Sequence, residues 1–155
     1  MQSGDVIELV QEIIRHELNL EKMYRQFAKS HPNHRQFWSD LAREEAMHAK
    51  WITSLARHYK NGRIGSSDFK LNHQVVKTSI SHLEKQTEAS KNGKLSLLNA
   101  ASIALDVEKS MIENKFFEIF DLADDTHAQI RAGLEKATSK HRQKLEKLFS
   151  ELSKN

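Results

Sequence analysis

The sequence predicts an all-α fold, in which four long helices form a bundle and a fifth, shorter helix lies in a long crossover connection. Helix-favouring residues such as Leu, Ala, Lys and Glu dominate, whereas the 155 positions include five glycines and one proline. That balance argues against a turn-rich β fold. Apolar residues recur at alternating spacings of three and four, as in helices that pack along one face. We expect residues 1–155 to form one domain with its own core.

Local turn signals set the expected helix boundaries. Asp5 and Glu8 have capping-box spacing at the first helix, and a second box begins at Thr126. Pro32 separates the first two helices, because the residue before a proline avoids α geometry. The Gly-, Ser- and Asn-rich segment 60–70 is the clearest loop. The expected helices span about 5–29, 34–59, 73–90 (in the crossover), 95–123 and 126–153.

The connection between the second and third long helices decides the expected arrangement. It is about 35 residues long and carries the short helix 73–90. Short turns make neighbouring helices antiparallel, whereas a long crossover lets the third long helix run parallel to the second. We therefore expect two helical hairpins side by side, and not an up-down-up-down bundle.

Polar residues of metal-ligand type interrupt the apolar stripe of each long helix. Glu17 interrupts the first stripe and Glu108 the third, while His141 lies in the fourth. The second stripe contains Glu45 and His48, whose i, i+3 spacing places both on one helix face. A carboxylate in a buried stripe is costly unless a cation or a hydrogen-bond partner meets it.

These interruptions lie at matching heights along the predicted helices. Glu17 lies 15 residues before Pro32, and Glu45 lies 13 after it. Glu108 and His141 lie 16 residues before and 17 after the second turn. At about 1.5 Å per residue, each lies roughly 20–25 Å from its turn, so we expect them to converge at mid-bundle. Three carboxylates and two imidazoles suit Fe, Mn or Zn, since Ca and Mg prefer oxygen ligands.

Three stretches of the chain resemble the ferritin-like superfamily, in particular the diiron domain of rubrerythrins: HELNLEKMYRQFA, LAREEAMHAKWI and ALDVEKSMIENKFFEIF. The resemblance spans nearly the whole chain and rests on the order Glu, Glu-x-x-His, Glu, and then a helix that bears His. It implies a ferritin-like four-helix bundle that holds a pair of irons. Residue by residue, the resemblance implies five metal ligands: Glu17, Glu45, His48, Glu108 and His141.

The sequence departs from this family pattern at specific positions. Thr138 stands three residues before His141, where the family has a glutamate. Leu105 and Met111 stand one turn from Glu108, where rubrerythrins carry an additional glutamate. The chain has no cysteine, so the rubredoxin-like module is absent, as are disulfides and iron–sulfur clusters. The missing carboxylate predicts weaker binding at one of two metal positions.

Other polar and aromatic residues have simpler structural interpretations. Tyr24 is expected to pack in the core, although its hydroxyl could orient a carboxylate. Glu44 is expected to face solvent or to support the site from outside, and Glu135 is an alternative carboxylate on the fourth helix. Trp38 and Trp51 are expected to be packing or interface residues. The remaining histidines are expected at the surface or at helix ends: His16, His31, His34, His58, His73, His82 and His127.

The resemblance implies a non-haem metal protein that holds one or two irons, or else zinc or manganese. Such a protein would oxidise Fe(II) or reduce dioxygen or peroxide, as a diiron-type oxidoreductase or peroxidase whose electron donor the sequence does not identify. The alternative function is a structural or binding helical bundle with a degenerate, metal-poor site. A basic, DNA-associated shell is disfavoured, because the net charge is only +3 and is scattered.

Location and partners follow from what the sequence lacks. The first residues contain no basic segment followed by a cleavage signal. No apolar stretch approaches the roughly 18 residues of a membrane span. We therefore expect a cytoplasmic protein with neither membrane nor nucleic-acid partners. Apolar residues outside the stripes indicate a homodimer face, namely Phe116, Phe117 and Phe120.

Overall fold

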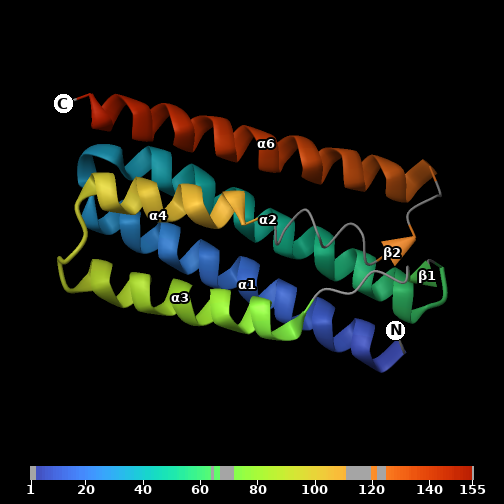
Figure 1. The fold of residues 1–155 in the computed structure, drawn as a ribbon. Coiled ribbons are helices and arrows are strands. Elements are labelled where there is room, and N and C mark those ends of the chain that lie inside the picture. Colours follow the sequence, from blue (N-terminus) through green and yellow to red (C-terminus); the bar gives the residue numbers. More distant parts are fainter. Residues whose placement is uncertain (1–2, 64, 67–71, 111–119, 122–124, 155) are drawn as a thin grey trace.

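The computed structural model describes residues 3–63, 65–66, 72–110, 120–121 and 125–154, and nearly all of them are helical (Figure 1). This part of the chain contains five α-helices: α1 (Ser3–Ser30), α2 (Arg35–Lys60), α3 (His73–Lys91), α4 (Leu97–Lys109) and α6 (Asp125–Ser153). A 3₁₀ turn, η1 (Pro32–His34), joins α1 to α2. Two short strands are β1 (Gly65–Ser66) and β2 (Phe120–Asp121). The prediction of an all-α fold is confirmed, apart from this strand pair.

The helices lie lengthwise beside one another and alternate in direction (Figure 1). α1 and α2 form an antiparallel hairpin, and α3 then runs back alongside α1. α4 consequently begins at the end of the molecule where α2 begins, and it runs in the same direction as α2. α6 returns antiparallel to α4 and packs against it. This is the direction that the long crossover predicts.

Side-chain caps explain where two of the helices begin. Ser96 Oγ accepts a hydrogen bond from the Asn99 backbone N–H at 3.0 Å, and Asn99 Oδ1 accepts one from the Ser96 N–H at 3.3 Å. This reciprocal capping box starts α4. The Asn72 side chain caps α3 by accepting from the Gln74 N–H. The box predicted at Asp5 is wrong, because α1 begins two residues earlier and Asp5 lies in its first turn.

The continuous helix predicted over 95–123 is also wrong. α4 ends at Lys109, and the Ser110 hydroxyl donates to the Val107 carbonyl at 2.6 Å. Serine side chains compete in this way with the helical hydrogen bonds of the backbone. Beyond it, Phe120 and Asp121 pair antiparallel with Ser66 and Gly65, so their backbone groups are satisfied in a strand pair. Residues 111–119 and 122–124 lie outside the described residues, and with them Phe116 and Phe117 of the expected dimer face.

The core consists of two apolar clusters at different heights. The first lies toward the start of α1 and contains Val6, Leu9, Val10, Ile13, Ile52, Leu55, Val76, Ile80 and Leu134. The second lies toward the other end and includes Leu20, Met23, Tyr24, Phe27, Trp38, Leu41, Leu83, Ala101, Ala104, Leu145 and Leu148. Trp38 is fully buried with its ring centroid 5.0 Å from that of Phe27, so its predicted packing role is confirmed. None of the described helices is long and apolar enough to cross a membrane.

Candidate metal centre

A layer of buried polar side chains separates the two apolar clusters. α1 contributes Glu17, α2 contributes Glu45 and His48, and α4 contributes Glu108. α6 contributes His141 and, one turn before it, Thr138. Each of these six residues is at most 5% exposed. The structure therefore brings all five predicted ligands to one level of the core, although the height predicted for Glu108 was counted along a helix that ends at Lys109.

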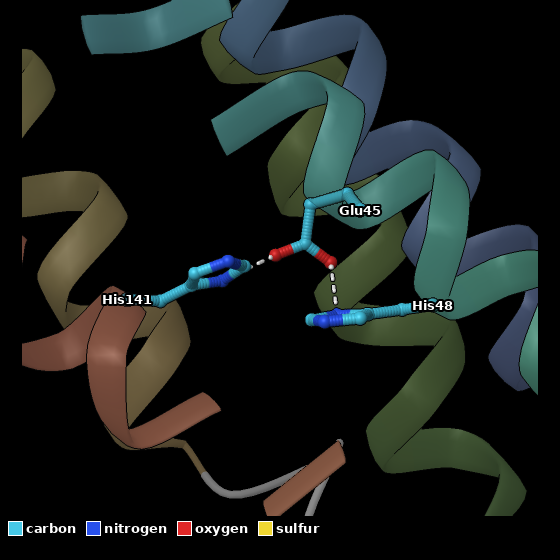
Figure 2. Close-up of side chains that lie close together, drawn as sticks. All are labelled: Glu45, His48 and His141. Atoms are coloured by element: carbon cyan, nitrogen blue, oxygen red, sulfur yellow. Dashed lines mark ion pairs between the residues drawn. The ribbon is translucent and has the colours of Figure 1, made fainter. Parts of the chain in front are cut away.

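Glu45 lies between the two imidazoles of this layer (Figure 2). Its Oε1 is 3.0 Å from His141 Nδ1, and its Oε2 is 3.4 Å from His48 Nδ1. The two rings stack, with centroids 5.1 Å apart and an interplanar angle of 27°. One ligand atom from each of the three residues lies within 4.8 Å of the other two, which is close enough to share a metal ion.

The other two carboxylates each contact one of the two imidazoles. Glu17 Oε2 is 3.9 Å from His48 Nδ1, and Glu108 Oε1 is 3.6 Å from His141 Nδ1. The layer thus divides into two potential metal positions that share Glu45. We call them the His48 position (Glu17, Glu45 and His48) and the His141 position (Glu45, Glu108 and His141). Each offers two carboxylates and one imidazole.

Tyr24 supports the His141 position from α1. It is fully buried, and its hydroxyl donates a hydrogen bond to Glu108 Oε1 at 2.9 Å. Besides packing in the core, Tyr24 therefore orients a carboxylate across the molecule, as one of the two sequence interpretations expected.

Glu44 contacts the far side of the His141 ring. Its carboxylate meets His141 Nε2, and Lys144 Nζ lies 3.4 Å from Glu44 Oε1. A carboxylate on the outer nitrogen of an imidazole fixes the ring orientation and leaves the inner nitrogen for a metal. In this structure the inner nitrogen is Nδ1, which faces Glu45 and Glu108. Of the two roles expected for Glu44, the supporting one agrees with these contacts.

The fourth helix provides no carboxylate in place of the missing glutamate. The Thr138 hydroxyl donates to the Leu134 carbonyl at 2.9 Å, which directs its hydrogen toward the helix backbone. Glu135 is 51% exposed and pairs with Arg131, so the alternative in which Glu135 reaches into the layer is wrong. The His141 position therefore has a neutral hydroxyl where the family pattern has a charged ligand.

His16 is buried, although it was expected at the surface. It is 1% exposed, its Nδ1 is 3.5 Å from Glu17 Oε1, and its Nε2 is 2.8 Å from Ser79 Oγ. The reason is that α3, which carries Ser79, packs on this face of α1. The sequence contains a pattern that indicates this burial. His16 completes the 4-3-4-3-4 spacing of a second stripe of α1, whose buried members are Leu9, Ile13, Leu20, Met23 and Phe27.

A second group of acidic residues and histidine lies away from this layer, where α3 packs on α1. Glu12 Oε2 is 2.9 Å from His73 Nδ1, with Glu8 beside them. Lys77 Nζ lies 3.5 Å from Glu12 Oε1 and already supplies a cation there. We interpret this group as an interhelical ion-pair network and not as a metal site.

The electrostatics of the polar layer stabilise charged forms despite burial. Burial opposes ionisation of Glu45, but its polar contacts with Glu17, His141 and His48 hold its pKa well below the ordinary 4.5. Burial also opposes protonation of His141, but the surrounding carboxylates raise the pKa of His141 to about 12. Without metal, His141 is therefore an imidazolium that partly neutralises the carboxylates. A metal ion that binds Nδ1 must displace this proton.

The metal-free protein is expected to be most stable between about pH 4.5 and 6.5. The pKa values of Glu45 and Glu44 are lowered from 4.5, so their contribution is present above that pH and is lost as the pH falls. The pKa of His141 is raised from 6.5 to about 12, so its contribution is lost as the pH rises above 6.5. Urea unfolding in chelator, measured from below pH 4.5 to above pH 6.5, tests this expectation. His141→Gln should reduce the loss of unfolding free energy above pH 6.5. An unfolding free energy that increases above pH 6.5 in the unmodified protein would contradict the raised pKa of His141.

The buried atoms of the layer fit a bound cation. Both carboxylate oxygens of Glu45 and both ring nitrogens of His141 are buried and form ion pairs within the layer, but these contacts lack normal hydrogen-bond geometry. Buried polar atoms of this kind call for a partner that compensates their lost hydration. A divalent ion between carboxylate and imidazole ligands is such a partner, and the mixed N/O donor set suits Fe, Mn or Zn.

The described part of the chain is thus a helical bundle with a buried carboxylate–histidine cluster in its core. Comparison with family models, with curated proteins and with solved structures finds no match for this chain. The functional argument therefore rests on the residues and geometry of the site itself.

Proposed function

We propose that this protein is a ferritin-like, rubrerythrin-type metal protein that binds iron in the polar layer and oxidises Fe(II) with peroxide or dioxygen. One observation carries the proposal: Glu45 contacts each of two stacked imidazoles with one carboxylate oxygen, in a layer of buried side chains. A carboxylate placed in this way can serve two metal positions at once, with Glu17 and Glu108 completing one position each.

The arrangement of the helices supports the ferritin-like part of the proposal. α1, α2, α4 and α6 each supply a residue to the layer, while α3 packs against α1. α4 runs parallel to α2 after the long connection that contains α3 (Figure 1). Ferritin-like bundles combine four ligand-bearing helices with one long crossover, so topology and site agree with each other.

The residues of the layer would have different roles in binding the metal. Glu17, Glu45 and Glu108 would offset its charge, and His48 and His141 would provide nitrogen ligands through Nδ1. Tyr24 and Glu44 would hold Glu108 and His141 in place through their contacts with these ligands. Ferrous iron would supply electrons to the oxidant. Reduction of one peroxide to two waters consumes two protons and two electrons, one electron from each of two ferrous ions.

The two positions are expected to differ in affinity. The His141 position has Thr138 in place of a carboxylate, and a metal there must also displace the proton that its surroundings favour on His141. We therefore propose that the His48 position fills first. A single ion at that position, whether iron, zinc or manganese, is the simplest loaded form.

A second candidate function is a structural or binding bundle whose site holds little metal. The charge state of His141 favours this alternative, because an imidazolium surrounded by three carboxylates compensates part of their charge without any ion. In this reading the layer would be a remnant that contributes to folding only.

Metal content separates the two functions. The protein should be purified without chelator, analysed for metals, and then titrated anaerobically with ferrous iron before peroxide is added. Two ions per chain that are oxidised by peroxide would support the diiron form, and one ion would support the asymmetric form. If the protein arrives without metal and takes up no ferrous iron, the iron proposal fails and the structural bundle remains.

Glu44→Gln is expected to weaken metal binding at the His141 position by about 10–100-fold, because His141 loses the carboxylate that orients its outer nitrogen. The same change should lower the pKa of His141, which NMR titration of the metal-free protein can follow. Glu135→Gln is the matched control, since Glu135 carries the same charge but is 51% exposed and pairs with Arg131. Equal metal affinities in the two variants would show that Glu44 does not support metal binding at the His141 position.

A further inference from the structure

A hollow of about 270 Å³ opens between α2 and α6, directly over the polar layer. His48, which is 2% exposed, is one of the residues that line it. Glu44 from α2 and three residues from α6 also line it, namely Gly133, Lys136 and Lys140. The hollow is large enough for several waters, each of which takes about 30 Å³ in the liquid. It therefore brings solvent-sized molecules to a residue of the His48 position.

Gly133 keeps this hollow open. It lies in the interior of α6, where glycine is a poorer choice than alanine because it loses more backbone entropy on folding. Packing does not require it, since a Cβ built at Gly133 would meet no described heavy atom within 4 Å. The visible effect of the missing side chain is the free space that it leaves in the wall of the hollow.

The charges around the hollow favour anions. Lys136 and Lys140 are exposed and line its α6 side. Glu44 lines the α2 side, but its carboxylate is engaged by His141 and by Lys144. Two lysines beside one neutralised carboxylate leave a positive local field, and such a field raises the local concentration and association rate of small anions.

We propose that this hollow, which we call the α2–α6 groove, is the entry route to the polar layer and admits a small anionic ligand to the His48 position. The inference rests on the proposed function for what the anion binds, namely a metal held by Glu17, Glu45 and His48. The route itself depends only on the groove, on Gly133 and on the position of His48 in the lining of the groove.

The route can be tested in the metal-free protein. Diethyl pyrocarbonate acylates accessible imidazoles, and peptide mass spectrometry reports the rate at His48 separately from the other histidines. Gly133→Leu places a side chain in the groove, while Gly133→Ala makes the same backbone change with little filling. We expect labelling of His48 to be lost in Gly133→Leu and retained in Gly133→Ala, with the same helical content in both. Equal labelling rates in the two variants would overturn the inference.

The preference for anions can be tested in protein loaded with Co(II), with azide as the probe and the visible spectrum as the readout. Lys136→Glu combined with Lys140→Glu is expected to slow azide association about tenfold at low salt, and high salt should reduce the difference. Gly133→Leu should slow association and dissociation alike and leave the equilibrium unchanged. If neither the double lysine substitution nor Gly133→Leu alters the rate of azide association, the proposal of an anionic route is overturned.

The two experiments distinguish failure of the route from failure of the proposed function. If Co(II) and Fe(II) do not bind, the proposed function fails, while the labelling of His48 still decides whether the groove leads into the layer. If the metal binds and His48 labels equally in all variants, the proposed function stands and the groove is not the entrance.

Discussion

Glu45→Gln is expected to abolish ferrous binding at both metal positions. Glu45 contacts both imidazoles, with oxygens 3.4 Å from His48 Nδ1 and 3.0 Å from His141 Nδ1. Glutamine keeps the shape of the side chain but removes the charge that would offset the metal. Anaerobic ferrous titration, followed by metal analysis after gel filtration, measures the loss.

The control for this experiment is Glu146→Gln, which removes an exposed carboxylate from α6. Its metal content should equal that of the unmodified protein. Loss of only one of two ions in Glu45→Gln would show that Glu45 serves a single position. Full retention of both ions would contradict the site described above.

Thr138→Glu is expected to strengthen the His141 position by at least about tenfold, because it restores a carboxylate one turn before His141 in the same buried layer. The same change should destabilise the metal-free protein by about 1–3 kcal/mol, since it buries another polar group without a partner. Metal should then stabilise the variant more than the unmodified protein. Ferrous titration and thermal unfolding, with metal or with chelator, measure the two effects.

Thr138→Gln separates charge from size in this experiment, because glutamine occupies a similar volume but brings no negative charge. It should share the loss of stability without the gain in affinity. If Thr138→Glu binds metal no better than Thr138→Gln does, the absent carboxylate is not what weakens the His141 position.

The five candidate ligands were predictable because each interrupts an apolar stripe of regular spacing. The height of Glu17 can be counted from the Pro32 turn, and it agrees with the single polar layer observed, whereas the count for Glu108 assumed a continuous helix to residue 123 and α4 ends at Lys109. The prediction of their function as metal ligands still awaits the titrations above. Helical periodicity therefore carries information about which side chains meet, even when they are 96 residues apart, as Glu45 and His141 are.

Other features depend on contacts that periodicity does not encode. α4 ends at Lys109, where the Ser110 hydroxyl donates to the Val107 carbonyl. Phe120 lies in a strand that pairs with Ser66. His16 is buried because α3 packs on its face of α1. Glu44 reaches His141 from a position that looks solvent-facing in the sequence. In each case a neighbouring element determines the environment of the residue.

The division of the core has a consequence for how the molecule unfolds. Two apolar clusters are separated by a layer of carboxylates and imidazoles, so hydrophobic contact is interrupted at mid-height. Cooperative unfolding units follow continuous packing, and each end of the molecule has packing of its own. An ion held by residues from α1, α2, α4 and α6 would tie the two ends into one cooperative unit. The metal would then act as a mechanical link, and its release would let one end open while the other stays folded.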